Sequence, residues 1–294
     1  VFLVPHSHND PGWLRTVDEY HTEYVRYLLN NVVAELTANP DRKFIEVEMA
    51  FFTRWYTVQP APVQAKVKTL LENGQLEFIN GGWTMADEAC TTYEAVVNQL
   101  TYGHRFLRNT FGITPKIAWH IDPFGASGTF PGMFKDAGFS SFIINRIYYQ
   151  LKTSWQGSQN LEFMWRGSPS RGKSAELFTH VLDSHYSCPY TFDWEYQLPG
   201  SINTFDLATT FASAMQTRAA YFRTPNVLVP MGNDFKYVIA TAAYSSMDVL
   251  IEHMNNNTKK YGMTLEYATL GDYMDAVNAS TATEKDYDGD FFPY

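Results

Sequence analysis

The chain has 294 residues, of which 45% are hydrophobic and 16% aromatic, a composition that excludes a largely disordered chain and allows a substantial core. Its net charge of −9 and the lack of a basic stripe in the sequence exclude a nucleic-acid partner. The sequence has no run of about 18 apolar residues, which excludes a membrane-spanning helix.

Predicted strands and helices alternate along the chain. The apolar run at residues 1–5 predicts a strand, and the apolar spacing from Val25 to Leu36 predicts an amphipathic helix. Further strands are expected at residues 42–52, 75–80, 116–121, 140–145, 176–182 and 226–231, and further helices at residues 63–71, 91–111, 130–135, 207–221 and 247–254. This order indicates βαβ units and a parallel sheet in one α/β domain. The pattern leaves open whether the sheet is open or closed into a barrel.

Polar and aromatic side chains follow every predicted strand. The segments after the first, fourth and seventh strands read HSHNDPGW, DPFG and GNDF. Because the carboxyl ends of parallel strands meet at one face, these segments are expected to share a pocket lined by carboxylates and aromatic rings. Such a lining is typical of a sugar-binding site.

His8 and Asp10 stand one residue apart after the first strand. In an extended segment the two side chains point the same way and can hold one cation. Asp122, after the fourth strand, is the expected third ligand. This set of nitrogen and oxygen donors suits zinc better than manganese or cobalt. The alternative is that His8 and Asp10 only cap the following turn and helix.

Two carboxylates after strands are the candidate catalytic groups. Asp122 lies on a turn that the following proline and glycine hold rigid, and Asp234 follows the seventh strand. Two carboxylates on one face are typical of glycoside cleavage, with one acting as nucleophile or base and the other as acid. Each aspartate taken alone is as well explained as a helix cap.

Further polar and aromatic residues have alternative roles. Trp13, Phe124 and Tyr186 are candidates for stacking on a sugar, although aromatic residues are more often core. Arg146 is a candidate for binding a carboxylate, or is an ordinary surface arginine. Structural roles are expected for four residues: His6 and His120 as hydrogen-bonded core histidines, and Asp87 and Glu88 as caps of the helix after the third strand.

Six segments resemble the class II α-mannosidases, family 38 of the glycoside hydrolases: HSHNDPGW, EMAFFTRWY, LEFINGGWTMADEA, WHIDPFG, MGNDF and DFFPY. They cover nearly the whole chain and match the N-terminal catalytic domain of that family. The resemblance implies an α/β fold with a parallel β/α barrel-like domain of about seven strands, of the glycoside hydrolase and deacetylase type.

The resemblance also implies a zinc-dependent, retaining, exo-acting α-mannosidase that removes terminal α-linked mannose from N-glycan-type oligosaccharides. Carried over by position, His8 and Asp10 bind Zn²⁺, Asp122 is both a zinc ligand and the nucleophile, and Asp234 is the acid/base. The zinc in this family holds two adjacent sugar hydroxyls. The residues expected to contact the mannose are Asp10, Trp13, Phe124, Arg146 and Tyr186.

The sequence departs from the family pattern in two ways. Ala126 stands where the family usually has histidine. The family's fourth zinc ligand is a histidine in a downstream HHD-type motif, which lies beyond Tyr294. We therefore expect residues 1–294 to be an incomplete catalytic domain that lacks the downstream three-helix and β domains and binds zinc poorly alone. Either another peptide of the same processed precursor supplies the missing ligand, or the chain is a fragment.

Location and assembly are less constrained. FFTRW, GHRFL and DFFPY resemble lysosomal members and HSHNDPGW resembles Golgi members, so a lysosomal or secretory location is expected, with the Golgi lumen as second choice. Sequons at Asn256 and Asn278 agree with a secretory route. Val1 is expected to mark the edge of a fragment or processed product. Pairing of Cys90 with Cys188 stays open, as does a homo-oligomer.

Two other functions fit the same residues. A metal-dependent carbohydrate deacetylase also places histidine and aspartate after the strands of a related barrel, but uses metal-bound water as its nucleophile. A sugar-binding module without turnover fits the missing ligand and Ala126.

Overall fold

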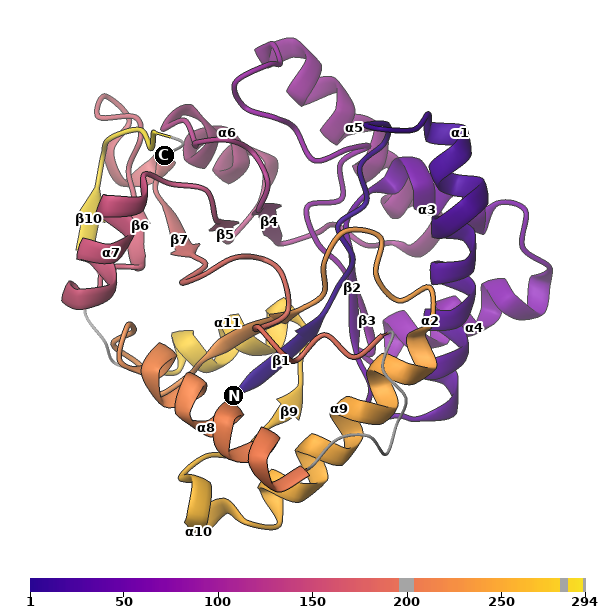
Figure 1. The fold of residues 1–294 in the computed structure, drawn as a ribbon. Helices are drawn as coiled ribbons and strands as arrows, with labels where there is room; N and C mark the ends of the chain where they lie inside the picture. Colours follow the sequence, from indigo (N-terminus) through magenta and orange to yellow (C-terminus); the bar gives the residue numbers. More distant parts are fainter. Residues whose placement is uncertain (196–203, 281–284, 293–294) are drawn as a thin grey trace. The chain divides into compact units, whose positions relative to one another are not determined.

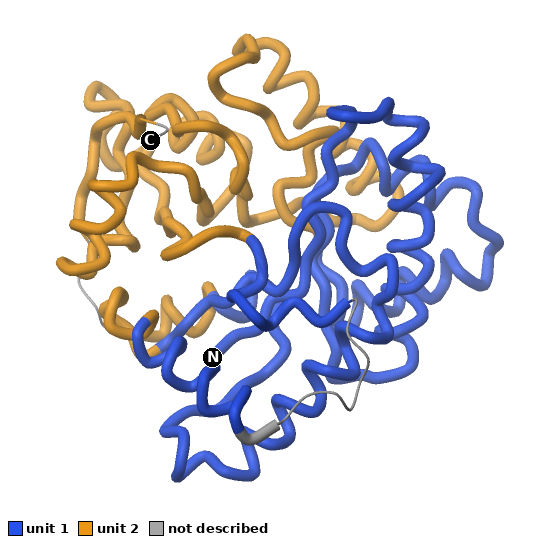
Figure 2. Tube along the Cα trace, in the orientation of Figure 1, with its two compact units in different colours: residues 1–77, 187–217, 226–273 blue, residues 78–186, 218–225, 274–294 orange. Residues whose placement is uncertain are grey.

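The computed structural model describes residues 1–195, 204–280 and 285–292 (Figure 1). The chain falls into two compact units, shown in Figure 2. Unit 1 comprises residues 1–77, 187–217 and 226–273, and unit 2 comprises residues 78–186, 218–225 and 274–294. None of the described helices is long and apolar enough to cross a membrane.

Unit 1 is built around parallel strands. β1 lies between β8 and β9 and runs parallel to both, and β2 pairs with β3 in a second small sheet. A parallel bridge between His6 and Ile45 links the segment after β1 to β2. The strands are β1 (Phe2–Pro5), β2 (Phe44–Glu46), β3 (Leu76–Phe78), β8 (Leu228–Met231) and β9 (Glu266–Tyr267).

The long helical stretch of unit 1 buries the apolar face that its sequence spacing predicts. Residues 17–38 form one nearly continuous helical stretch, opened by a capping box at Thr16 and Glu19, and its buried face includes Leu28, Val32 and Leu36. The helices are α1 (Val17–Tyr20), the π-helical turn His21–Val25, α2 (Arg26–Ala38), α3 (Met49–Tyr56), α4 (Ala61–Glu72), most of α8 (Thr204–Ala219), α9 (Ala240–Asn255), α10 (Thr258–Tyr261) and the start of α11 (Leu270–Asn278).

Unit 2 contains a five-stranded sheet in the order β10-β6-β7-β5-β4. β4, β5 and β7 are parallel, whereas β6 runs antiparallel to β7. Phenylalanine and tryptophan side chains dominate the core on this sheet, including Phe142 stacked on Trp165. The elements are α5 (Tyr93–Phe111), β4 (Ile117–His120), α6 (Thr129–Ala137), β5 (Ser141–Ile144), α7 (Tyr149–Ser158), β6 (Glu162–Trp165), the 3-10 turn Gly172–Ala175, β7 (Leu177–Val181) and β10 (Lys285–Tyr287).

The expected α/β fold with parallel strands is confirmed, and all seven predicted strands are present. A barrel is not confirmed, because the described strands form separate sheets of three, five and two strands. The strand expected over residues 42–52 is wrong in its second half, where α3 begins at Met49. Strands β6, β9 and β10 and helices α3, α7, α10 and α11 were not expected. Part of the stretch 185–203, in which no strand or helix is expected, lies outside the described residues.

A close backbone approach in unit 2 gives a stability prediction. Gly103, in the middle of α5, lies against the backbone of Gly81 and Gly82, and a Cβ atom at position 103 would come within 2.0 Å of the Gly81 carbonyl oxygen. Because both neighbours are backbone atoms, Gly103→Ala is expected to lower the free energy of unfolding by about 3 kcal/mol, measured by urea denaturation. Gly157→Ala in α7 is the control: its added Cβ meets nothing within 4 Å, so it should stabilise slightly or have no effect. Equal effects of the two substitutions would refute the steric explanation.

Candidate active site

The carboxyl ends of β1 and β8 bring His8 and Asp234 side by side in unit 1. Their backbones form a parallel bridge, in which the N–H of His8 donates to the Asn233 carbonyl at 3.1 Å and the N–H of Phe235 donates to the His8 carbonyl at 2.9 Å. The His8 residue is 4% exposed, whereas Asp234 is exposed to solvent. His8, a predicted metal ligand, and Asp234, the predicted acid/base, therefore lie next to each other beyond the carboxyl ends of two paired strands.

His8 and Asp10 also lie together, as their spacing suggests. The Nε2 atom of His8 is 3.3 Å from Oδ1 of Asp10. Two donors bonded to one tetrahedral zinc ion at about 2.1 Å lie about 3.4 Å apart, so this pair fits two ligands of a single ion. Trp13 follows in the same segment and is 69% exposed.

Two buried carboxyl groups near this pair were not expected. Glu48 lies at the N-terminus of α3 and Glu46 at the end of β2, and both are almost fully buried. Burial raises the pKa of Glu48 to about 8, with nearby His8 opposing the rise and the Asp10 carboxylate adding to it. Burial, and then Glu48, raise the pKa of Glu46 well above its usual range. Perturbed carboxyl groups gather at functional sites, and the sequence signal was two acidic residues alternating in the apolar run FIEVEM.

In unit 2, Asp122 follows β4 and is held by an arginine that follows β5. Nε and Nη2 of Arg146 both donate to Oδ1 of Asp122, at 2.9 and 2.5 Å. The turn after β4 is tied to the segment after β5 by Gly125, whose N–H donates to the Arg146 carbonyl at 3.1 Å and whose φ of 92° suits glycine. Charge-assisted hydrogen bonds of this kind stabilise the ionised form of the carboxylate. Asp122 is thus fixed in direction and favoured as an anion.

Aromatic rings flank the arginine. The guanidinium carbon of Arg146 lies 4.6 Å from the centre of the Phe124 ring and 5.9 Å from that of Tyr186. Phe124 is 44% exposed and Tyr186 is 4% exposed. Phe124 therefore presents a ring to solvent, whereas Tyr186 packs as part of the wall behind Arg146.

Glu88 does not cap α5, contrary to expectation, since Thr92 occupies that position. Its carboxylate bonds Nδ1 of His120 at 2.8 Å and accepts the N–H of Ser127 at 2.6 Å. Glu88 therefore holds the chain at His120, before Asp122, and at Ser127, after it. His120 is buried and its ring packs against phenylalanines, which agrees with a structural role; His6 is likewise buried. The Asp87 carboxylate accepts the N–H of Ala89, and the Asp87 carbonyl accepts the N–H of Cys90, so Asp87 does not cap α5 either.

Other residues singled out in the sequence have defined surroundings. Ala126 is buried, and its backbone pairs with Phe291 of the DFFPY segment through hydrogen bonds of 3.0 and 2.8 Å. Cys90 and Cys188 are free thiols, so no disulfide joins them.

The predicted site residues divide between the two units. His8, Asp10, Trp13 and Asp234 belong to unit 1, and Asp122, Phe124, Arg146 and Tyr186 belong to unit 2. The structure brings His8 together with Asp10 and Asp234 in one unit. It brings Arg146 together with Asp122, Phe124 and Tyr186 in the other. The meeting of both sets in one pocket, and of Asp122 with His8 and Asp10 on one ion, stays a prediction.

Comparison with known proteins gives one family. The model of the glycosyl hydrolases family 38 N-terminal domain matches residues 1–294. The lysosomal alpha-mannosidase of Dictyostelium discoideum is 43% identical over 310 aligned residues, which cover 100% of this chain and 31% of that protein. The chain thus spans about a third of the length of the curated relatives it matches.

Solved structures show the same fold. An alpha-mannosidase from Enterococcus faecalis V583 superposes with a TM-score of 0.77 at 18% identity, over 99% of this chain and 30% of that one. A putative polysaccharide deacetylase from Mycobacterium smegmatis superposes with a TM-score of 0.57 at 11% identity, over 96% of this chain and 92% of that one. At these identities the likeness is one of fold alone.

Proposed function

The chain belongs to glycosyl hydrolase family 38, as its N-terminal domain, and from this premise we propose that it is the catalytic part of a retaining, exo-acting α-mannosidase. The observation that carries the proposal is the 43% identity to a lysosomal alpha-mannosidase over the whole chain. The proposed substrate is the terminal α-linked mannose of an N-glycan-type oligosaccharide.

Asp122 is proposed as the nucleophile and Asp234 as the acid/base. Two hydrogen bonds from Arg146 keep Asp122 charged and oriented, as an attacking carboxylate requires. Asp234 is exposed on the turn after β8, where it can reach a glycosidic oxygen. Asp234 would protonate that oxygen while Asp122 bonds to the anomeric carbon, and would then take a proton from the water that releases the sugar.

The proposed metal ligands are His8, Asp10 and Asp122, with zinc as the ion. The 3.3 Å separation of the His8 and Asp10 donors supports this choice. When bound, the ion would supply a Lewis-acidic contact for sugar hydroxyl oxygens. Trp13 and Phe124, with their exposed rings, are proposed to pack against the sugar and to shield the reacting carbon from water.

A lysosomal or secretory location is proposed, with the Golgi lumen as the second choice. The sequon asparagines Asn256 and Asn278 are both exposed, as glycan acceptors must be. A fourth zinc ligand is proposed to come from another peptide of the same precursor.

For the whole precursor or its assembled peptides, the proposal predicts hydrolysis of an aryl α-mannoside in ¹⁸O-labelled water, with α-mannose as the first product. NMR follows the reaction. The label is expected on the anomeric oxygen, because water attacks the glycosyl-enzyme at that carbon. Release of labelled acetate from an acetylated sugar, with unlabelled mannoside, would establish the deacetylase instead. Saturable mannose binding without turnover would establish the sugar-binding module.

A further inference from the structure

The turn that carries Asp234 is held in a strained shape. After β8, Phe235 and Tyr237 have φ values of 51° and 72°, in the left-handed region that non-glycine residues rarely adopt. Such conformations persist only where the surrounding contacts over-determine them. The contacts that hold this turn therefore also fix where Asp234 points.

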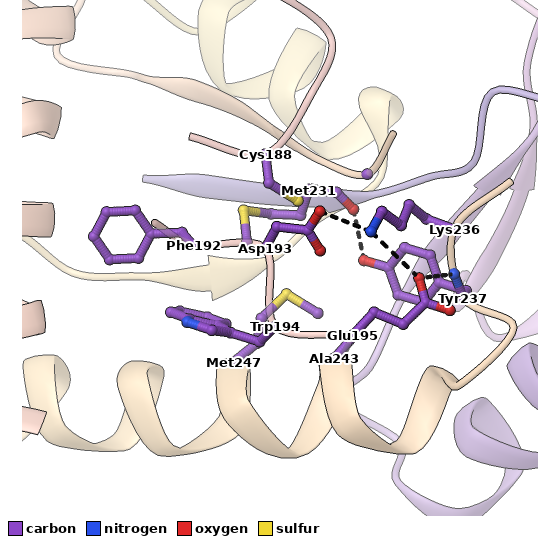
Figure 3. Close-up of a pocket in the computed structure, with 11 residues that line it drawn as sticks. Cys188, Phe192, Asp193, Trp194, Glu195, Met231, Lys236, Tyr237, Ala243 and Met247 are labelled. Atoms are coloured by element: carbon purple, nitrogen blue, oxygen red, sulfur yellow. Dashed lines mark hydrogen bonds and ion pairs between the residues drawn. The ribbon is translucent and has the colours of Figure 1, made fainter. Parts of the chain in front are cut away.

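A second segment of unit 1 supplies those contacts, through Glu195 above all. One carboxylate oxygen of Glu195 accepts the N–H of Tyr237 at 2.9 Å, and the other accepts the N–H of Ile239 at 2.7 Å. Glu195 is 2% exposed, so no water competes strongly for these bonds. Figure 3 shows its carboxylate directed at Tyr237 and Lys236.

An ion pair adds to the same grip. Nζ of Lys236, two residues after Asp234, lies 2.7 Å from the carboxylate of Asp193 and 4.0 Å from that of Glu195. Nearer to β8, the N–H of Cys188 donates to the Gly232 carbonyl at 2.8 Å. Residues 187–195 and 232–239 are thus joined at both ends of the turn.

Tight packing leaves the turn little freedom. The Tyr237 hydroxyl donates to the Met231 carbonyl at 2.6 Å, and the ring of Phe235 stacks on Tyr20 with centroids 4.2 Å apart. The pocket lined by Cys188, Glu195 and their neighbours (Figure 3) leaves only about 10 Å³ for solvent. A change at Glu195 is therefore passed to the backbone of the turn rather than absorbed by a cavity.

We propose that Glu195 is a positioning residue for proton transfer: it locks the 232–239 turn so that Asp234 meets the glycosidic oxygen. This inference rests on the proposed function, in which Asp234 is the acid/base. Glu195 itself touches no reacting atom. Its carboxylate is needed because two oxygens must each accept one N–H, which an amide cannot do.

The test compares α-mannosides with poor and good leaving groups. Glu195→Gln is expected to lower kcat/KM for methyl α-mannoside by about 10- to 100-fold, the scale of a small misplacement. It should leave kcat/KM for dinitrophenyl α-mannoside nearly unchanged, because this leaving group needs no protonation. Azide, which needs no general base, should raise kcat of the variant on the dinitrophenyl substrate.

Two further variants make the result decisive. Asp234→Asn should show the same selectivity on a larger scale, about 10²- to 10⁴-fold; its absence would overturn the proposed function. Glu77→Gln is the matched control, since Glu77 also accepts a backbone N–H, that of Gly271 at 3.0 Å, but holds no site residue. If Asp234→Asn shows the selectivity and Glu195→Gln behaves like Glu77→Gln, the positioning role is wrong.

Asp193→Asn is a second variant that tests the positioning role of Glu195. If Glu195→Gln fails to fold, Asp193→Asn loosens the same turn through Lys236 while keeping both bonds of Glu195. It is expected to give the same leaving-group selectivity at about threefold, the scale of a partly exposed ion pair. Equal losses on both substrates would overturn the proposal.

Discussion

Asp122→Asn is expected to lower kcat on an aryl α-mannoside by roughly 10⁴- to 10⁶-fold, the scale on which removal of a nucleophile acts. The amide keeps an oxygen that can accept from Arg146, so the turn after β4 should hold its shape. The substitution removes the negatively charged carboxylate, whose oxygen is proposed to form the bond to the anomeric carbon. A slowly hydrolysed fluorinated mannoside should label the peptide containing residue 122 in the wild type, detected by mass spectrometry, and leave the variant unlabelled.

Asp136→Asn is the matched control for this experiment. Asp136 also lies in unit 2 and also pairs with an arginine, Arg171, through bonds of 2.8 and 2.7 Å. It lies in α6 rather than after a strand, and the pair is largely exposed, so the substitution should change activity and stability little. An Asp122→Asn protein with near wild-type kcat, or label on another residue, would show that Asp122 is not the nucleophile.

The pairing of Asp122 with Arg146 follows from features that the sequence carries. β4 and β5 are parallel neighbours in the register His120 to Ile144. Residues two positions beyond that pair, Asp122 and Arg146, therefore leave the sheet at the same level. The apolar residues of KIAWHI and SSFIIN predict both strands, and the polar residues that follow are candidate site residues for that reason.

The limits of sequence patterns are clear at β2 and α3. Apart from Glu46 and Glu48, the run FIEVEMAFF is apolar, so the sequence pattern does not separate three strand residues from the helix that begins at Met49. Glu48 precedes that helix without any side-chain cap hydrogen bond, which removes the usual start signal. Because the strand was predicted to continue to residue 52, the burial of the Glu46 and Glu48 carboxyl groups was not predicted.

Glu88 and Glu195 could not be assigned from the sequence for a different reason. Their partners are far along the chain: Glu88 bonds His120 and Ser127, 32 and 39 residues away, and Glu195 bonds Tyr237 and Ile239, 42 and 44 residues away. Local propensity favours a cap or a surface position for an isolated glutamate. Only the tertiary structure shows that both carboxylates hold the turns that carry the proposed catalytic aspartates.

Removal of bound metal is expected to abolish α-mannosidase activity, and Zn²⁺ should restore it better than Mn²⁺ or Co²⁺, because one imidazole and carboxylates suit zinc. Loss of a residue that only hydrogen-bonds to a metal ligand lowers metal affinity by about 10- to 100-fold. His8 is itself a proposed ligand, so His8→Gln should lower zinc affinity by more than this. Zinc content after dialysis, measured by atomic absorption, and activity on an aryl α-mannoside give the two readouts.

His253→Gln is the matched control, because His253 is also in unit 1 but bonds the Tyr261 hydroxyl at 3.0 Å in a helix away from the strand ends. It should keep both zinc and activity. Nε2 of His8 lies 3.3 Å from Oδ1 of Asp10. Substitution of His8 therefore removes one metal-donor atom and leaves Asp10 as the remaining ligand of this pair. A His8→Gln protein that retains one zinc per chain and full activity would show that this pair does not hold the ion, and the catalytic assignment would then have to stand on the two aspartates alone.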